Sequence, residues 1–283
     1  MLKLFAVLIA LAKVKISATS GAEAIDYNKQ GDWGGVCNDA GSKKQSPVDV
    51  IIPEKSASQK EALFNLTGNA DKADARNTQD KNSIKISFKT EIDYKIPGLK
   101  ETSGQVKQLH LHWGKADAEG SEHLLNGKRF SAEAHLVTTY TNNNIEKNAV
   151  VARFFKVGEA NAQIQKMIDS GSDGSDLEIS EFNLTALYPS DISKVVIYSG
   201  SLTTPDCTEN VHWMIVPEPL TISELQLTSL RGAILGEEGA AKTFNWRKKQ
   251  ELNGREFKSY TSSSSHFRMS VVVLLSAILY AIY

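Results

Sequence analysis

The sequence of 283 residues predicts a single, mainly β domain with a processing segment at each end. Short runs rich in β-branched and aromatic residues recur along its middle part, and the polar stretches between them are typical of loops. No internal repeat and no linker rich in Pro and Gly divides this part. The formal net charge of −1 gives no reason to expect nucleic acid or an anionic membrane surface as a partner.

Six of these runs have the length and composition of strands, and they lie at 83–88, 105–113, 132–140, 149–157, 194–199 and 211–216. The polar stretches 67–82 and 170–176 are expected to be loops.

Two short helices are also expected. In the segment 159–169, Ile164, Met167 and Ile168 share one helical face. A second helix is expected to begin near Ser223, a good N-cap residue, and to run to Arg231.

The first 24 residues are typical of a signal peptide. Lys3 precedes an apolar run over 4–12, which has the length of a signal-peptide core and is too short to span a bilayer. Cleavage is expected after Ser20 or after Ala24, and the domain then spans 25–261.

Residues 262–283 combine small residues, a short polar spacer and a terminal apolar run. This arrangement favours a GPI-attachment signal, although the spacer is shorter than usual. A short membrane-spanning tail is the alternative. Either tail would hold the domain at the extracellular face of the cell membrane.

If the chain is secreted, its two cysteines, Cys37 and Cys207, most simply form one disulfide, because the compartment is oxidising. Secretion also makes glycosylation possible at the two sequons, Asn65 and Asn183, although such short motifs recur by chance.

The stretch QLHLHWG at 108–114 places two histidines two residues apart. In a strand, Gln108, His110 and His112 share one face, while Leu109, Leu111 and Trp113 share the opposite, core-facing one. The two imidazoles then lie side by side. This pattern is either half of a metal site or a chance pairing of histidines on a polar strand face.

The expected strand at 132–140 places Glu133 and His135 on one face. If it lies near the first strand, His135 faces His110 and His112, and three histidines with one open position describe a catalytic zinc site. Gln108 and Glu133 each precede a histidine by two residues on the same face, where an acceptor holds the second nitrogen of a ligand imidazole. These acceptors favour the metal site over histidines on polar strand faces.

The chain resembles the α-class carbonic anhydrases from about Tyr27 to Phe257. That family's motifs occur in its order as QLHLHWG, SEHLLNG at 121–127, AEAHLV at 132–137, GSLTTPDC at 200–207 and VHW at 211–213. The flanks GDWGGVC at 31–37, QSPVDV at 45–50, PEPLTIS at 217–223 and LNGR at 252–255 agree as well. The cysteine pair also falls where secreted and membrane-attached members carry their disulfide.

The resemblance implies a large, twisted, mostly antiparallel central sheet and reversible hydration of carbon dioxide to bicarbonate and a proton. By this match His110, His112 and His135 bind zinc. Gln108, Glu133 and the Asn245 backbone orient these ligands.

The resemblance also implies an orienting relay and a substrate site. Thr203 would donate its hydroxyl proton to Glu122, and its oxygen would then only accept from a zinc-bound hydroxide and fix its orientation. Thr203 and Thr204 would contact bicarbonate. Carbon dioxide is apolar, and its wall would consist of Val137, Val150, Leu202, Val211 and Trp213.

Fast members of the family pass protons to solvent through a histidine near the zinc. The matching stretch 77–88, with Lys81 or Asn82 near that position, contains no histidine. An unperturbed lysine, with a pKa of about 10.4, holds its proton too tightly at neutral pH to replace it. We therefore expect slower proton transfer that depends on external buffer.

Two other functions are alternatives. A non-catalytic binding or adhesion module can use the same fold, but such relatives typically lack a zinc histidine and this chain has all three. Hydrolysis of activated esters would be a side reaction of the same centre.

Overall fold

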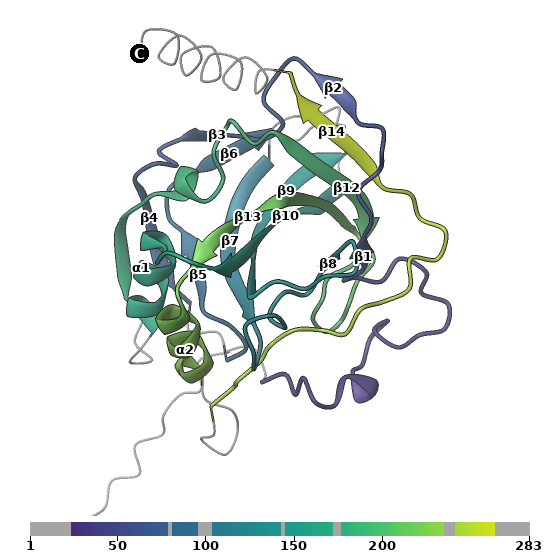
Figure 1. The fold of residues 1–283 in the computed structure, drawn as a ribbon, viewed down its shortest axis with the longest axis horizontal. Coiled ribbons are helices and arrows are strands. Elements are labelled where there is room, and N and C mark those ends of the chain that lie inside the picture. The colour runs from purple at the N-terminus through teal and green to yellow at the C-terminus, as the bar shows by residue number, and fades with distance from the viewer. Residues whose placement is uncertain are drawn as a thin grey trace, which may run out of the picture.

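The computed structural model describes residues 24–78, 81–95, 104–142, 145–171, 177–234 and 241–263. Nearly all of the predicted signal peptide and of the C-terminal tail lies outside these residues. The described part is mainly β, and it is built around one large sheet with two short helices at one side (Figure 1). Across these ranges, the helices are all too short or too polar to cross a membrane.

The central sheet has the strand order β11-β4-β5-β7-β9-β10-β13-β12-β14-β2, with β3 and β6 paired beside β7. Its strands are β2 (Ala57–Gln59), β3 (Asn65–Gly68), β4 (Ala73–Asn77), β5 (Lys85–Phe88), β6 (Ile92–Lys95), β7 (Gly104–Trp113), β9 (Ala132–Asn142), β10 (Ile145–Val157), β11 (Glu178–Phe182), β12 (Lys194–Gly200), β13 (Val211–Ile222) and β14 (Lys258–Ser262).

Most neighbouring strands of this sheet are antiparallel, as predicted. The parallel pairs are β10 with β13 and β14 with β2. A separate small parallel pair joins β1 (Asp49–Val50) to β8 (Leu124–Leu125). Short 3₁₀ helices lie at Gln30–Asp32 and Leu184–Ala186.

All six predicted strands are present, as β5, β7, β9, β10, β12 and β13. Both predicted helices are present as α1 (Ala162–Gly171) and α2 (Glu224–Ala233). Ser223 caps α2 in a capping box with Gln226, in which each side chain bonds the other's backbone N–H. Ile164, Met167 and Ile168 form the buried face of α1, as the spacing predicted.

The prediction of a continuous loop over 67–82 was wrong, because β4 lies within it. Ala73, Ala75 and Asn77 are its buried positions and alternate with exposed residues. Alanine and asparagine are weak strand formers, so the alternation left no apolar signal in the sequence. Of the predicted loop at 170–176, Ser170 and Gly171 end α1 and the rest lies outside the described residues.

The sheet separates two apolar cores. One, called here the helix-side core, holds Leu109, Leu111 and Trp113 of β7 together with residues of both helices. The other, called here the metal-side core, holds Val150, Trp213 and their neighbours. The alternation along β7 therefore sends its apolar side chains to the helix side and leaves its histidines on the metal side.

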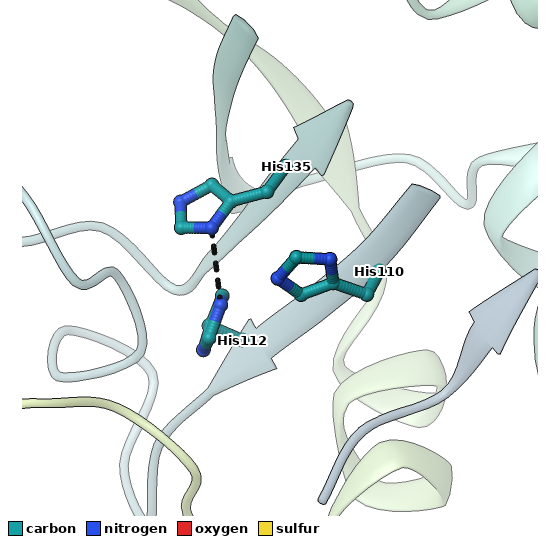
Figure 2. Close-up of side chains that lie close together, drawn as sticks. All are labelled: His110, His112 and His135. Carbon is teal, nitrogen blue, oxygen red and sulfur yellow. Dashed lines mark hydrogen bonds between the residues drawn. The ribbon is translucent and has the colours of Figure 1, made fainter. Parts of the chain in front are cut away.

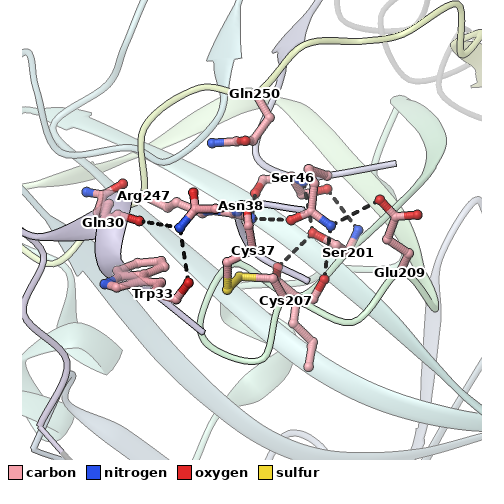
Figure 3. The surroundings of a disulfide bond; sticks show 12 residues. Gln30, Trp33, Cys37, Asn38, Ser46, Ser201, Cys207, Glu209, Arg247 and Gln250 are labelled. Carbon is pink, nitrogen blue, oxygen red and sulfur yellow. Dashed lines mark hydrogen bonds between the residues drawn. A yellow bond between two sulfur atoms is a disulfide. The ribbon is translucent and has the colours of Figure 1, made fainter. Parts of the chain in front are cut away.

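Cys37 and Cys207 form the predicted disulfide, across a sequence separation of 170 residues (Figure 3). Beside it the Arg247 guanidinium donates to the Cys37 and Ser46 carbonyls and to Gln45 Oε1. The disulfide and Arg247 thus hold the N-terminal segment against the loop after β12.

Replacing both cysteines, as Cys37→Ser with Cys207→Ser, is expected to lower the free energy of unfolding by about 5 kcal/mol, since the bond closes a very long loop of the unfolded chain. Urea unfolding of the double variant measures the change. Wild-type protein unfolded in a reductant is the matched control and should lose the same amount. Equal stability of the variant and the oxidised wild type would contradict this expectation.

Candidate metal centre

The antiparallel register of β7 and β9 brings three histidines together. His110 pairs directly with His135, and His112 pairs with Glu133. Figure 2 shows the rings of His110, His112 and His135 pointing to one region from two neighbouring strands. One ring nitrogen from each lies within 4.8 Å of those of the other two.

In each of these imidazoles, the ring nitrogen that points away from the cluster donates its proton to a fixed acceptor. His110 Nδ1 lies 2.8 Å from Gln108 Oε1, and His112 Nδ1 lies 2.7 Å from the Asn245 carbonyl oxygen. His135 Nε2 lies 2.7 Å from Glu133 Oε1. These acceptors cannot donate, so the proton is on the histidine in every case. The remaining nitrogens are Nε2 of His110 and His112 and Nδ1 of His135, and each presents a lone pair.

The convergence of these lone pairs fits a cation. His112 Nε2 and His135 Nδ1 are 3.1 Å apart, the contact drawn as a dashed line in Figure 2. Since the outer acceptors hold both protons elsewhere, two lone pairs face each other there and would repel. A metal ion bound by both nitrogens removes this conflict.

Burial favours the neutral form of two of the ligand imidazoles, His110 and His135. Burial, and then the neighbouring histidines, lowers the pKa of His110 well below its usual value. Burial also lowers the pKa of His135, although Glu133 opposes this shift. Neutral imidazole is the form that binds metals.

Two carboxylates lie behind the histidines. Burial opposes ionisation of Glu133, but the nearby His123 and His135 and their hydrogen bonds outweigh it and hold the pKa of Glu133 far below its usual range.

Glu122 is fully buried, and its Oε1 accepts from the Arg247 backbone N–H. Its Oε2 has no hydrogen-bond partner in the described structure and lies 3.5 Å from His112 Nε2. An unpartnered carboxylate oxygen beside the lone pairs of His112 and His135 again fits a bound cation.

The predicted relay from Thr203 to Glu122 is not formed by a hydrogen bond in the described part of the chain. Thr203 is buried, and Thr204 lines the cavity above the histidines. The loop that carries both threonines is held by Ser201, whose hydroxyl accepts from the Ser46 N–H and whose carbonyl accepts from the Trp213 indole N–H.

The five residues predicted to line the carbon dioxide site gather in the metal-side core. Val150, Val211 and Trp213 are buried in it, and Val137 and Leu202 pack against it. Val150 lies between Val137 and Trp213 on neighbouring strands. The Trp213 ring lies 4.8 Å from the His135 ring, between centroids. An apolar wall therefore adjoins the histidine cluster.

A cavity of about 590 Å³ opens above His110 and His112. Asn82 and Lys85 line this cavity together with Asp26 and Tyr27. Both belong to the stretch 77–88, which matches the position of the proton-carrying histidine in fast family members. Asn82 Oδ1 accepts from the Ile25 N–H and from Lys242. Lys85 lies directly opposite His110 on β5.

From its place beside Glu122, the sequence predicts that His123 is a buried, hydrogen-bonded residue, and this is confirmed. The hydrogen-bonded chain that it forms behind Glu133 was not predicted. His123 donates from Nδ1 to Glu133 Oε1 and from its backbone to Oε2. Its Nε2 accepts from the Tyr198 hydroxyl, which in turn contacts Ser46 Oγ. These bonds use the facing atoms of His123 and Glu133, so the two residues support His135 and do not form a second metal site. The position of His123 beside Glu122 was the only signal in the sequence.

The comparisons with known proteins agree with this geometry. The sequence model of eukaryotic-type carbonic anhydrases matches residues 28–261. Rabbit (Oryctolagus cuniculus) carbonic anhydrase 1 is 34% identical over 239 residues, which cover 76% of this chain and 98% of that protein. Bovine (Bos taurus) carbonic anhydrase 3 is 28% identical over 252 residues, 83% of this chain and 96% of that protein. Human carbonic anhydrase 3 is 32% identical over 166 residues, 53% of this chain and 64% of that protein. The chain therefore belongs to the eukaryotic-type, or α-class, carbonic anhydrase family.

Proposed function

We propose that this enzyme reversibly hydrates carbon dioxide to bicarbonate and a proton with zinc at the three histidines. One observation carries the proposal: three imidazole lone pairs converge, and an acceptor behind each ring fixes its tautomer. Zinc fits because three neutral imidazoles with a fourth position left open are a donor set of catalytic zinc sites. When bound, zinc lowers the pKa of a coordinated water, an effect for which carbonic anhydrase is the standard example.

The residues around the histidines hold the site rigid. Gln108, Glu133 and the Asn245 carbonyl keep each ligand ring in one tautomer and one direction. Glu133 receives three hydrogen bonds, two of them from His123, and so it cannot swing away from His135. The negative charges of Glu122 and Glu133 lie close enough to favour a divalent cation.

Thr203 and Glu122 are proposed to orient the reacting hydroxide. Donation from the Thr203 hydroxyl to the free oxygen of Glu122 would satisfy that buried acceptor. The Thr203 oxygen would then be able only to accept, so the hydroxide would donate to it and present a lone pair to the substrate carbon. Carbon dioxide would lie against the wall of Val150, Trp213 and their neighbours, and Thr204 in the cavity would contact bicarbonate.

Proton transfer is proposed to depend on external buffer. Within the described residues, the histidines that line the cavity are the two ligands His110 and His112. Asn82 lies where a histidine would be needed, and its amide does not titrate near neutral pH. The hydrogen bond from the Asn28 backbone lowers the pKa of Asp26, which makes that carboxylate a weak base.

The enzyme is proposed to act at the extracellular face of the cell membrane. The disulfide supports passage through an oxidising compartment. The apolar tail is proposed to direct attachment of a GPI anchor, with a short membrane tail as the alternative. Glycosylation is proposed at Asn65, on β3, and at Asn183, which also caps the 3₁₀ helix Leu184–Ala186.

Removing zinc should abolish carbon dioxide hydration by the purified protein, and zinc added back should restore it. His112→Ala should lose both zinc and activity, because two ligands do not complete the site. Gln108→Ala should weaken zinc binding roughly 10- to 100-fold through a loosened His110. His212→Ala, a histidine on β13 outside the cluster, is the matched control. Full activity of metal-free protein would contradict the proposal.

Turnover at saturating carbon dioxide should rise with the concentration of imidazole buffer and then reach a plateau, because the buffer carries the proton out of the cavity. Asn82→His should make turnover less dependent on buffer, while Asn82→Gln should leave the dependence unchanged. Stopped-flow hydration assays measure both. High turnover of the wild type that is indifferent to buffer concentration would refute this proposal.

Phosphatidylinositol-specific phospholipase C should release the protein from intact cells, because that enzyme cleaves a lipid anchor and leaves a peptide tail intact. Activity in the cell supernatant measures the release. A variant that ends at residue 261 is the control and should appear in the medium without treatment. Retention of the full chain on treated cells would favour the membrane-spanning tail.

A further inference from the structure

Arg153 of β10 is a buried cation without a hydrogen-bond or ion-pair partner among the residues that the structure describes. Its side chain is 5% exposed, and its Nε is enclosed without a hydrogen-bond acceptor. No hydrogen bond or ion pair of its guanidinium occurs within the ranges that the structure describes. A guanidinium has five donors and remains charged, so burying it without acceptors is costly. Burial lowers the pKa of Arg153, and the charges of Tyr188, Glu218 and Asp191 oppose this shift.

The strand beside Arg153 is interrupted. Arg153 pairs with Val216 of β13, and the next pair is Phe155 with Leu220, so three residues of β13 lie opposite one residue of β10. Two of the three are Pro217 and Pro219, which have no backbone N–H to complete the ladder. The bulge opens the sheet next to the guanidinium.

A cavity of about 260 Å³ lies at this place. Arg153 lines it together with a second cation, Lys194, and with Ser193. Two exposed carboxylates, Asp191 and Glu218, belong to the same lining, so its formal charge is balanced before any ligand enters. A cavity of this size has room for a small ion and a few waters but not for a nucleotide.

We propose that the Arg153 cavity is a binding site for a small oxyanion, with the guanidinium as its main donor and Lys194 and Ser193 as further donors. A planar fork of N–H groups matches two oxygens of a carboxylate, bicarbonate or phosphate group. The ligand would supply the acceptors that the buried guanidinium lacks. The balanced lining charge favours an anion of low charge.

This site is separate from the histidine cluster. Ala152 pairs with His135 across β10 and β9, and Arg153 is the next residue, so its side chain points to the opposite face of the sheet. Val216 and Ile192, which line the cavity, belong to the helix-side core. The proposal therefore does not depend on the proposed zinc chemistry.

Thermal unfolding and isothermal titration of the full protein test the site. The probes are sodium phosphate and sodium acetate, each compared with sodium chloride at the same ionic strength. The variants are Arg153→Met and Arg153→Lys. Arg76→Met is the matched control, because Arg76 is a half-exposed arginine near Glu178 on another strand.

Phosphate or acetate should raise the melting temperature of the wild type and of Arg76→Met above the value in chloride. Arg153→Met should lose most of this rise and bind the same anion at least ten-fold more weakly. The rise in melting temperature of Arg153→Lys should lie between those of the wild type and Arg153→Met, since lysine keeps the charge without the fork of N–H groups. In chloride, Arg153→Met should be at least as stable as the wild type, because an unpaired buried charge is gone.

Two results would overturn the proposal. One is an equal rise in melting temperature in the wild type and Arg153→Met. The other is a wild type that neither oxyanion stabilises, together with an Arg153→Met that is less stable in chloride. That second pattern would mean that Arg153 finds its acceptors within the protein.

Discussion

The pairing of β7 with β9 is the constraint on which the site depends. His110 and His135 meet because they are directly opposite each other, and Gln108 and Glu133 are on the same face. Since side chains alternate along a strand, a slip of one residue would move the histidines of one strand into the apolar core. Leu109, Leu111 and Trp113, fully buried on the reverse of β7, make that slip costly. Apolar packing on one face thus holds the geometry of the polar face.

A second layer of contacts turns three nearby imidazoles into a directed set of donors. Gln108 and Glu133 each come from the same strand as the ligand they hold, whereas the Asn245 carbonyl comes from a segment 133 residues away from His112. That segment is itself fixed. Arg247 reaches from the Glu122 carboxylate to the region of the disulfide, and Asn245 Oδ1 accepts from the Trp113 N–H. The C-terminal part of the domain therefore closes the site and sets the tautomer of His112.

The two faces of the central sheet present opposite electrostatic situations. On the metal side, buried carboxylates and imidazole lone pairs converge without a proton between them, which favours a cation. On the other side, beside a proline-containing bulge of β13, a buried guanidinium lacks acceptors and favours an anion. The Glu122 carboxylate and the Arg153 guanidinium are both buried polar groups that the described chain leaves unsatisfied. Such groups are rare because they cost free energy. We therefore interpret both as sites for ligands.

The sequence alone determined the mainly β fold, six of the strands, both helices, the disulfide and the histidines with their same-strand acceptors. Strand and helix periodicity carry most of this information, since they are local properties of the chain, and the disulfide follows from the presence of just two cysteines. The sequence could not reveal β4, whose buried face is built of Ala73, Ala75 and Asn77, because small and polar residues give no apolar alternation. The tertiary structure alone decided the support of Glu133 by His123 and Tyr198 and the isolation of Arg153 beside the β13 bulge. It also left Glu122 Oε2 without the expected partner, Thr203. These features depend on strand register and on contacts between distant segments, and no local pattern encodes them.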